Sequence, residues 1–400
     1  MSLVETVRAG RGWRIATRTI PLAAVALALA TASATAQVAG ARAKPFAAWP
    51  APKIDAHMTV AQAKAFVAEH TQPQTKWIGP TTGPKAPREK LTLAWVANPA
   101  YTPYIYWGDG VKDAAKALGW KVVTFNGRGT PSGWLAAMDQ ALALKPAAII
   151  TPFDAHALQK PIKEAIARGI PVIGIHAAAY PGPNPQLGLY MNITSNPADI
   201  GRSEAAYVIA ATNGSAHDIH MVDDTYAIAR FKAKATIEPI KNCSGCKLLE
   251  EVSVPIATMA TRMSSVVSGL LARHGNSWWM TTCCDGYYPY VAAALRASGE
   301  SPEKVHLVGS DGPPTSYEMI RKGGYEVATV PEPSTLFGYE AVDAAIRAFA
   351  GKPPAHFVQP TYIVTKADIN AEGGSKNQFI PSNNFACHYK NIWLGTHNPC

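Results

Sequence analysis

The chain has 400 residues, of which 48% are hydrophobic and 16% are charged, and its formal net charge is +9. This length exceeds the usual size of one domain, so the composition predicts a globular protein of two lobes and excludes a chain dominated by disordered charged tails. The Lys and Arg residues are spread along the sequence without a basic cluster, which argues against a nucleic-acid-binding protein.

Residues 1–36 have the features of a secretory signal peptide. Four arginines precede an apolar run from Ile20 to Ala30, and the small residues Ala34 and Ala36 follow in the pattern of a cleavage site. The run is too short for a lasting membrane anchor, and no Cys near the cut could carry a lipid. An amphipathic organelle-targeting peptide is the alternative. We therefore expect a soluble mature protein in the periplasm.

Residues 37–89 form the next segment. Thr59–Glu69 is a candidate for a short helix, whereas the Gly- and Pro-rich residues 79–87 predict an extended linker, because Gly and Pro interrupt helices and sheets. We expect this segment to be an N-terminal extension ahead of the first lobe.

From about residue 90, short apolar strands alternate with amphipathic helices. Helical spacing is clear over Val111–Leu118 and Met263–Leu271, with Gly119 and Gly275 as stops. Continuous apolar runs are typical of strands covered on both faces, so the pattern predicts an α/β fold of doubly wound, mostly parallel sheets with flanking helices. The predicted strands are Thr92–Ala97, Lys121–Phe125, Ala147–Thr151, Pro171–Ile175, Asp218–Val222, Lys247–Val252, Trp278–Thr282, Val305–Gly309 and Tyr325–Val330.

Six cysteines in an exported chain predict disulfide bonds. The spacing favours three local pairs, which are Cys243–Cys246, Cys283–Cys284 and Cys387–Cys400. For Cys283 and Cys284, a vicinal disulfide, a structural role and free thiols all stay open. The Cys243–Cys246 motif precedes a strand, so we expect a structural clip and not a redox centre. Because Cys283 and Cys284 are adjacent, a four-cysteine zinc site is not expected, nor is any other metal or cofactor.

An ordered set of segments over residues 90–366 resembles the ribose- and sugar-binding type of periplasmic solute-binding protein, which serves ABC importers. Residues 98–104, Asn-Pro-Ala-Tyr-Thr-Pro-Tyr, resemble the Asn-Pro-aromatic loop after the family's first strand. Residues 328–333, Ala-Thr-Val-Pro-Glu-Pro, are similar to one of its late binding loops. The other segments of the set are 110–119, 145–152, 168–173, Asp285 with Gly299, and 308–312.

The resemblance implies a two-lobed type I periplasmic binding protein whose lobes, joined by a three-stranded hinge, close around a small polar ligand. We expect the first lobe to comprise residues 90–193 and 333–363. The second lobe should comprise residues 194–332 and 364–400, including a tail clipped by its disulfide. The three crossovers should lie near 191–195, 332–333 and 363–364.

The candidate ligand contacts of the first lobe lie in loops after its strands, where open α/β sheets bind ligands. Tyr101 and Tyr104 offer aromatic faces that stack on sugar rings, or they pack the edge of the lobe. Asn98 offers a donor and an acceptor, or it caps the following turn. Asp154 either binds ligand hydroxyls or caps the next helix.

Further candidates stand at positions where the resemblance implies polar pocket residues. His176 replaces the first residue of an Asp-Arg pair, or it is an ordinary loop residue. Lys232 replaces an Arg, whose role Arg230 could take instead. Cys284 replaces an Asn and Glu332 replaces a Gln. These departures argue against ribose itself as the ligand.

Asp285 and Asp311 follow consecutive predicted strands, so their loops should converge at one edge of a sheet. Carboxylates accept charge-assisted hydrogen bonds from hydroxyl groups, which suits a sugar or a polyol. We expect Asp311 to be the main polar contact, with a structural cap as its alternative role.

No nucleophile elbow, HExxH or Walker motif is present in the sequence, so we expect a binding protein and not an enzyme. The resemblance implies a monomer that captures a sugar or polyol and delivers it to an ABC transporter permease. A periplasmic sensor for a receptor kinase or chemoreceptor, and a binder of a small aromatic compound, are the alternatives.

Overall fold

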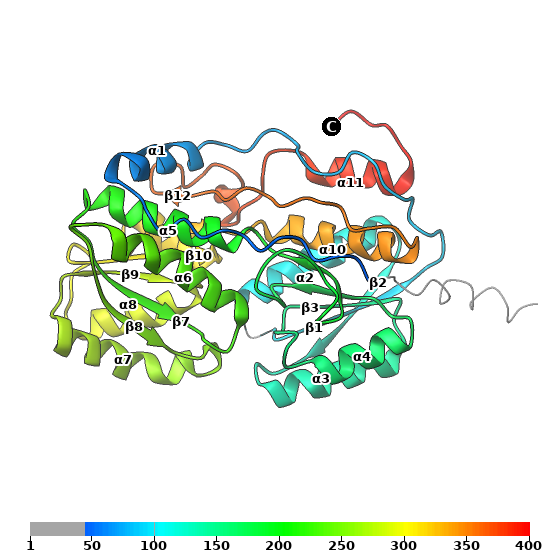
Figure 1. Cartoon of the computed structure of the whole chain (residues 1–400), viewed down its shortest axis with the longest axis horizontal. Helices are drawn as coiled ribbons and strands as arrows, with labels where there is room; N and C mark the ends of the chain where they lie inside the picture. Colours follow the sequence, from blue (N-terminus) through cyan, green and yellow to red (C-terminus); the bar gives the residue numbers. More distant parts are fainter. Residues whose placement is uncertain (1–44, 100) are drawn as a thin grey trace, which may run out of the picture. The chain divides into compact units, whose positions relative to one another are not determined.

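The computed structural model describes residues 45–99 and 101–400, so the predicted signal peptide lies outside the described residues. The described chain contains two six-stranded sheets with helices packed on them (Figure 1). We name the elements built on the first sheet the first lobe, and those built on the second sheet the second lobe. Among the described helices, none combines the length and the apolar character that crossing a membrane requires.

The first sheet has the strand order β2-β1-β3-β4-β6-β5. All neighbours are parallel except β5, which pairs antiparallel with β6. Its strands are β1 (Thr92–Ala97), β2 (Lys121–Asn126), β3 (Ala148–Thr151), β4 (Val172–Ile175), β5 (Gly182–Asn184) and β6 (Leu189–Ile193). The helices packed on this sheet or on each other here are α2 (Thr102–Ala117), α3 (Pro131–Leu144), α4 (Gln159–Ala167) and α10 (Ser334–Phe349).

The second sheet repeats this plan with the order β12-β11-β10-β9-β7-β8, in which only β12 is antiparallel to its neighbour. Its strands are β7 (His217–Val222), β8 (Lys247–Ser253), β9 (Trp278–Thr282), β10 (Val305–Asp311), β11 (Glu326–Pro331) and β12 (Val364–Thr365). Its helices are α5 (Pro197–Ala211), α6 (Ala227–Asn242), α7 (Met259–His274), α8 (Tyr288–Ala297) and α9 (Pro314–Lys322), with short 3₁₀ turns η1 (Ile256–Thr258), η2 (Asp285–Tyr287) and η3 (Gly374–Lys376).

The predicted two-lobed α/β fold is therefore confirmed, and each predicted strand matches an observed one to within two residues at either end. The sequence analysis missed β5, β6 and β12. β5 and β12 have only three and two residues, too few to show an apolar pattern. Gly110 and Gly338 let the backbones of α2 and α10 touch in the first lobe, since a Cβ at Gly338 would lie 2.1 Å from the carbonyl carbon of Gly110.

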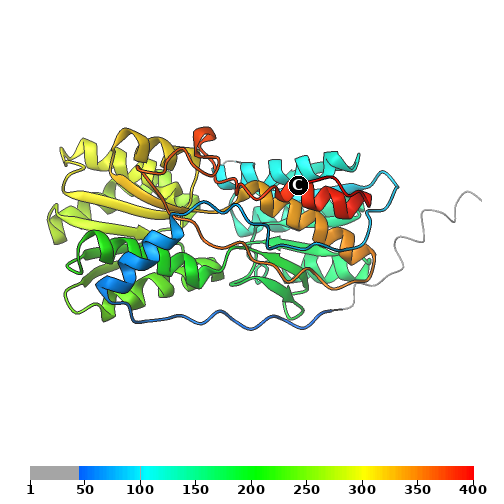
Figure 2. The ribbon, with the colours of Figure 1, turned by 90° about the horizontal axis from the view of Figure 1, so that it is seen from above.

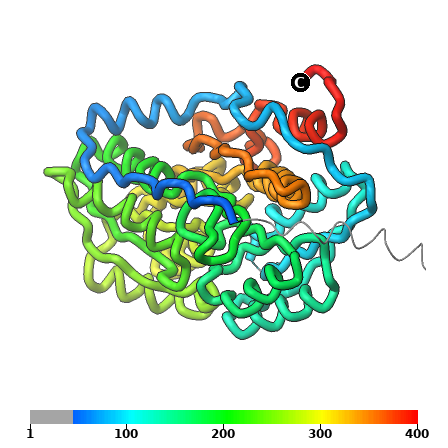
Figure 3. The backbone as a smooth tube through the Cα atoms, turned by 45° about the vertical axis from the view of Figure 1, so that its right-hand side comes forward, coloured from blue at the N-terminus to red at the C-terminus, as the bar shows by residue number. Residues whose placement is uncertain are grey.

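The N-terminal extension is packed along both lobes (Figures 2 and 3). The predicted short helix is present as α1 (Val60–His70), which begins with a capping box between Thr59 and Gln62 and packs on α5. Before it, the ring of Phe46 meets Tyr190 of the first lobe edge-on at 5.9 Å. After it, residues 79–87 form neither helix nor strand, as expected for the linker.

The C-terminal tail differs from the prediction, which placed residues 364–400 in the second lobe. Residues before η3 and after it contact that lobe, and Arg321 donates to Asn377 at 2.6 Å. The last helix, α11 (Phe385–Leu394), instead packs on α10 of the first lobe. Trp393 stacks on Tyr339 at 5.5 Å and donates its Nε1–H to Asp343 at 3.0 Å. α11 carries an apolar stripe at positions i, i+4 and i+8. This stripe explains why α11 packs on α10, because apolar side chains are stabilised when a hydrophobic core covers them.

Two of the three predicted disulfides are present. Cys243–Cys246 and Cys387–Cys400 are bonded, with Cα separations of 5.2 and 5.7 Å. The predicted third bridge is wrong, because Cys283 and Cys284 are free thiols. The Cα atoms of adjacent residues are only about 3.8 Å apart, below the ~4.4–6.8 Å that disulfides usually span.

Candidate functional site

An aromatic wall lies at the N-terminal end of α2, directly after β1. It consists of Tyr101, Tyr104 and Trp107, which are spaced three residues apart and therefore share one face of the helix. All three are buried. Their rings contact in sequence, with centroids 4.8 Å apart for the first pair and 5.2 Å for the second. The first lobe thus presents a rigid and uncharged surface at the carboxyl end of its sheet.

A polar wall faces it from the second lobe. It consists of Lys232 on α6, Cys283 and Cys284 after β9, and Asp311 at the end of β10. The Nζ atom of Lys232 lies 3.0 Å from Asp311 Oδ1 and 3.6 Å from Glu332 Oε1. Lys232 is 2% exposed, so its charge is balanced by two carboxylates and not by water.

Hydrogen bonds join the two lobes across the cleft. The Tyr101 hydroxyl donates to Asp311 Oδ2 at 3.1 Å, and the Tyr104 hydroxyl donates to the Tyr226 hydroxyl at 3.4 Å. A further bond runs from the backbone N–H of Ala227 to Asp154 Oδ2 at 2.9 Å. These contacts hold the lobes closed around the site.

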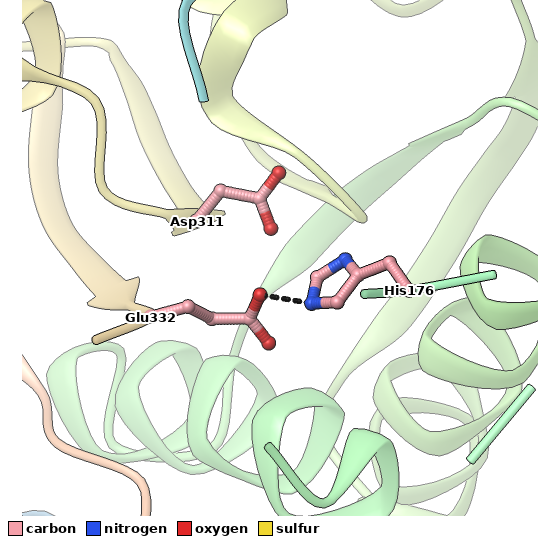
Figure 4. Close-up of side chains that lie close together, drawn as sticks. All are labelled: His176, Asp311 and Glu332. Atoms are coloured by element: carbon pink, nitrogen blue, oxygen red, sulfur yellow. Dashed lines mark ion pairs between the residues drawn. The ribbon is translucent and has the colours of Figure 1, made fainter. Parts of the chain in front are cut away.

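His176, Asp311 and Glu332 form a cluster at the base of the cleft (Figure 4). The Nε2 atom of His176 is ion-paired with Glu332. His176 and Asp311 both have left-handed backbones, with φ of 63° and 88°, which costs about 1–3 kcal/mol for a residue with a side chain. Strain of this kind gathers at functional sites, and here it turns both side chains toward one point.

Each of these three residues offers one ligand atom, and the three atoms lie within 4.8 Å of one another, so the cluster could hold a metal ion. The ammonium group of Lys232 already contacts both carboxylates. It supplies the positive charge that a metal ion would bring to this cluster.

The electrostatics keep Lys232 and Glu332 ionised. Burial opposes the charge on Lys232, but Asp311 and Glu332 raise its pKa above the ordinary value. Burial likewise opposes the charge on Glu332, yet His176 and Lys232 hold the pKa of its carboxyl below the ordinary value. Lys232 and Glu332 are therefore both charged at neutral pH, and the charge of each stabilises the charge of the other.

Two phenols and one thiol of the cleft are neutral. Burial raises the pKa of both Tyr101 and Tyr104 well above the usual range. The hydrogen bond from Cys283, together with burial, raises the pKa of the Cys284 thiol. The cleft thus combines paired charges with uncharged phenol groups and the uncharged thiol of Cys284.

Several predicted site residues lie outside the cavity. Asp285 is fully buried behind it, where it accepts from Thr329 at 2.6 Å, and burial, then Asp311, raises the pKa of its carboxyl well above the ordinary value. Asp154 caps the start of α6 from the opposite lobe. Arg230 is exposed, donates to the carbonyl of Asp224 and does not line the cavity.

The cavity between the walls has a volume of about 40 Å³. Ligand pockets usually measure ~300–1,000 Å³, so this cavity is smaller than the usual site for a small molecule. A hollow of about 500 Å³ lies elsewhere on the first lobe, beside Phe46 and Tyr190, but its lining is apolar. The residues that line the 40 Å³ cavity are Tyr101, Tyr104, Trp107, His176, Tyr226, Ile228, Ala229, Lys232, Ile256, Cys283, Cys284 and Asp311.

This lining brings together six of the predicted ligand contacts, including Cys284. It leaves out Asn98, whose side chain lies beside Gly129. Glu332 lies just behind it, in contact with His176 and Lys232. The sequence analysis did not name six lining residues as ligand contacts, which are Tyr226, Ile228, Ala229, Ile256, Trp107 and Cys283. The first three begin the helix after β7, so the rule that ligands lie beyond strand ends could have indicated them.

Comparisons with known proteins agree with this geometry. Residues 93–353 match the model of the family described as periplasmic binding protein domain, and no curated protein matches the sequence significantly. A sugar ABC transporter protein from Yersinia enterocolitica has a similar structure, with a TM-score of 0.64 and 18% identity over 79% of this chain and 99% of that one.

Two further solved structures are similar. An ABC transporter solute-binding protein from Agrobacterium vitis, bound with α-D-tagatopyranose, has a TM-score of 0.64 and 18% identity, covering 72% of this chain and 99% of its own. The myo-inositol-binding protein of Caulobacter has a TM-score of 0.62 and 16% identity, covering 74% and 99%. At these identities the likeness shows the fold, and the family match covers well over half of the sequence. The chain therefore belongs to the periplasmic binding protein domain family.

Proposed function

We propose that this protein is the periplasmic substrate-binding component of an ABC importer, which captures a sugar or polyol between its lobes and delivers it to a membrane permease. The observation that carries the proposal is the pairing of the aromatic wall with the polar wall across one cleft. The similar structures that contain tagatopyranose and myo-inositol support the ligand class. Residues 1–36 would direct export, and the protein would act as a monomer without turnover.

The two walls divide the recognition of such a ligand. The C–H face of a sugar ring would stack on Tyr104 and Trp107, as flat apolar surfaces do on aromatic rings. Hydroxyl groups would reach Asp311 and Lys232, which accept and donate charge-assisted hydrogen bonds. The ligand would replace the direct bond between Tyr101 and Asp311 when the lobes close on it.

A small aromatic compound is a second candidate, favoured by the aromatic wall itself. In the closed cleft the ionic groups are paired with one another. A flat, weakly polar ligand would leave those pairs intact and still bury its faces against the rings. A sensor role in signalling would use the same ligand site.

The test is a thermal-shift screen followed by isothermal titration calorimetry. The mature protein would be screened with D-tagatose, D-ribose, myo-inositol, glycerol and simple aromatic acids. A ligand at 1,000 times its dissociation constant stabilises the native state by about 4 kcal/mol, which a melting curve detects easily. No shift with any sugar or polyol would contradict the proposed ligand class.

Variants of the aromatic wall then locate the site. Tyr104→Ala should lower the affinity for the ligand found by about two- to tenfold, because ring stacking contributes on the order of 0.5–1.5 kcal/mol. Tyr106→Ala is the matched control, since Tyr106 is on the same helix, half-buried and outside the cavity lining. Equal affinities for the two variants would place the ligand elsewhere.

A further inference from the structure

The polar wall contains two adjacent thiols that sugar recognition does not need. Cys283 and Cys284 are the free cysteines of the described chain, and both line the cavity. They are 3% and 4% exposed, and their Sγ atoms lie 4.0 Å apart. Two buried thiols that face one small cavity are an unusual feature, because isolated buried cysteines normally serve only as small apolar side chains.

The turn that carries the thiols is fixed on several sides. The Cys283 carbonyl accepts from Ser310 Oγ at 2.8 Å, and the Cys284 carbonyl accepts from Thr282 Oγ1 at 3.3 Å. Tyr101 of the opposite lobe covers the turn, since a Cβ at Gly286 would lie 2.9 Å from its ring. The backbone polar groups of the turn are therefore occupied, and the side chains of both cysteines line the cavity.

The spacing of the sulfurs favours chelation over a disulfide. Two sulfur atoms 4.0 Å apart, each about 2.3 Å from one metal ion, would subtend an angle of roughly 120° at that ion. This angle lies in the range of trigonal and tetrahedral coordination, and it requires no movement of the turn. A disulfide would instead need the sulfurs to approach to about 2.05 Å across a shorter Cα separation than usual.

We propose that Cys283 and Cys284 form a binding site for one soft, thiol-seeking cation of the Zn²⁺ or Cu⁺ class. Thiolate ligands select such cations over Mg²⁺ or Ca²⁺. On binding, each thiol releases its proton to solvent and each sulfur donates an electron pair, with no change in oxidation state. The cavity of about 40 Å³ has room for an ion and one or two small ligands. The site goes beyond sugar binding and does not depend on which sugar is bound.

The experiment uses Cd²⁺ alone as a probe, because cadmium–thiolate bonds absorb in the ultraviolet. Mature protein would be purified anaerobically, its free thiols counted with a chromogenic disulfide, and CdCl₂ then titrated. We expect two free thiols and one tightly bound Cd²⁺ per chain. Cys283→Ser and Cys284→Ser should each weaken binding by more than about 100-fold, beyond the loss typical of an outer-shell partner.

A matched control separates this site from the other cysteines. The double variant Cys243→Ser/Cys246→Ser loses a disulfide but keeps both cleft thiols, so it should bind Cd²⁺ as wild type does. If a serine variant fails to fold by circular dichroism, cadmium nuclear magnetic resonance of the wild type still shows whether the ion has sulfur ligands. Unchanged affinity in both serine variants, a shift without sulfur ligands, or a Cys283–Cys284 disulfide found by mass mapping would each overturn the proposal. The sugar screen is read separately, so failure of one idea leaves the other intact.

Discussion

The two lobes share one folding plan but bring different chemistry to the cleft. The aromatic wall comes from a single helix and consists of rings that contact one another. The polar wall is assembled from α6 and the ends of β9 and β10, and its charges contact Glu332 at a crossing between the lobes. The aromatic surface of the site is therefore determined by neighbouring residues of one lobe. The ionised groups of the site instead depend on partners that are distant in sequence.

This difference has an energetic consequence. A buried ring that loses one neighbour keeps most of its contacts, because dispersion is spread over many atoms. A buried charge that loses its partner keeps the full desolvation cost. Substitutions in the polar wall should therefore destabilise the protein most. Substitutions at the bonds that join the lobes should have a smaller effect, and substitutions on the surface the smallest.

The largest effect is expected for Lys232→Met. The substitution leaves Asp311 and Glu332 buried without their cation, and breaking such a pair typically costs about 3–5 kcal/mol. The measurement is the free energy of unfolding from urea denaturation. Lys234→Met, on the exposed side of the same helix, is the control and should change little. If both variants lose the same small amount, the charges are not coupled as the structure indicates.

The second effect concerns pH and a buried acid of the second lobe. Glu326 is 1% exposed, and burial, with a smaller contribution from Asp285, raises the pKa of its carboxyl well above the ordinary 4.5. The folded state therefore holds a proton that the unfolded chain releases, so this contribution to stability is complete below pH 4.5 and is lost as the pH rises toward the folded pKa.

Glu326→Gln removes that titration and keeps the shape of the side chain. Above pH 4.5, the stability of the wild type should fall faster with pH than that of the variant, by up to about 1.4 kcal/mol per pH unit. Thermal unfolding between mildly acidic and neutral pH measures the two slopes. Parallel curves would mean that Glu326 is ionised in the folded protein.

The sequence could predict the elements of both lobes because their signals are local. β1 and β9 were predicted with their observed ends, since continuous apolar runs bounded by polar residues are typical of buried parallel strands. The rule that ligands bind beyond the carboxyl ends of strands also identified Asp311 and Tyr104, and the structure places both in one cavity. A short-range pattern is sufficient for such features.

The partners of the charges could not be predicted in the same way. Nothing in the sequence near Lys232 indicates that Glu332, a hundred positions away, supplies its second contact. The position of α11 on α10 could not be predicted for a similar reason. The apolar stripe of Phe385, Tyr389 and Trp393 indicates that α11 packs on a hydrophobic core, but it does not indicate which lobe provides that core. Asp154 was expected either to bind ligand hydroxyls or to cap the next helix, but that helix, α4, has no side-chain cap, and Asp154 instead accepts from the first N–H of α6 in the other lobe.

A smaller effect is expected for Asp154→Ala, which tests a bond that joins the lobes. Asp154 accepts from the first N–H of α6, a helix whose own N-cap residue, Tyr226, makes no side-chain cap. Losing a cap costs about 0.5–2 kcal/mol, and here the loss should favour opening of the cleft. Small-angle X-ray scattering should show a larger radius of gyration without ligand, whereas Asp224→Ala, an exposed residue nearby, should not change it. An unchanged radius would mean that other contacts are sufficient to hold the lobes closed.

The smallest effect is expected on the surface, where the N-terminal extension meets the second lobe. Asp55 is ion-paired with Arg202, and its hydrogen bond to that guanidinium holds the pKa of the carboxyl below its ordinary value. Both side chains are partly exposed, at 50% and 27%, so solvent and salt screen the pair. Asp55→Ala should therefore lower the free energy of unfolding by no more than about 1 kcal/mol, and most of that difference should vanish in high salt. If Asp55→Ala lowers the free energy of unfolding as much as Lys232→Met does, this one contact, and not the packing of α1 on α5, holds the extension. The expectation that buried charges contribute more to stability than exposed charges would then be wrong.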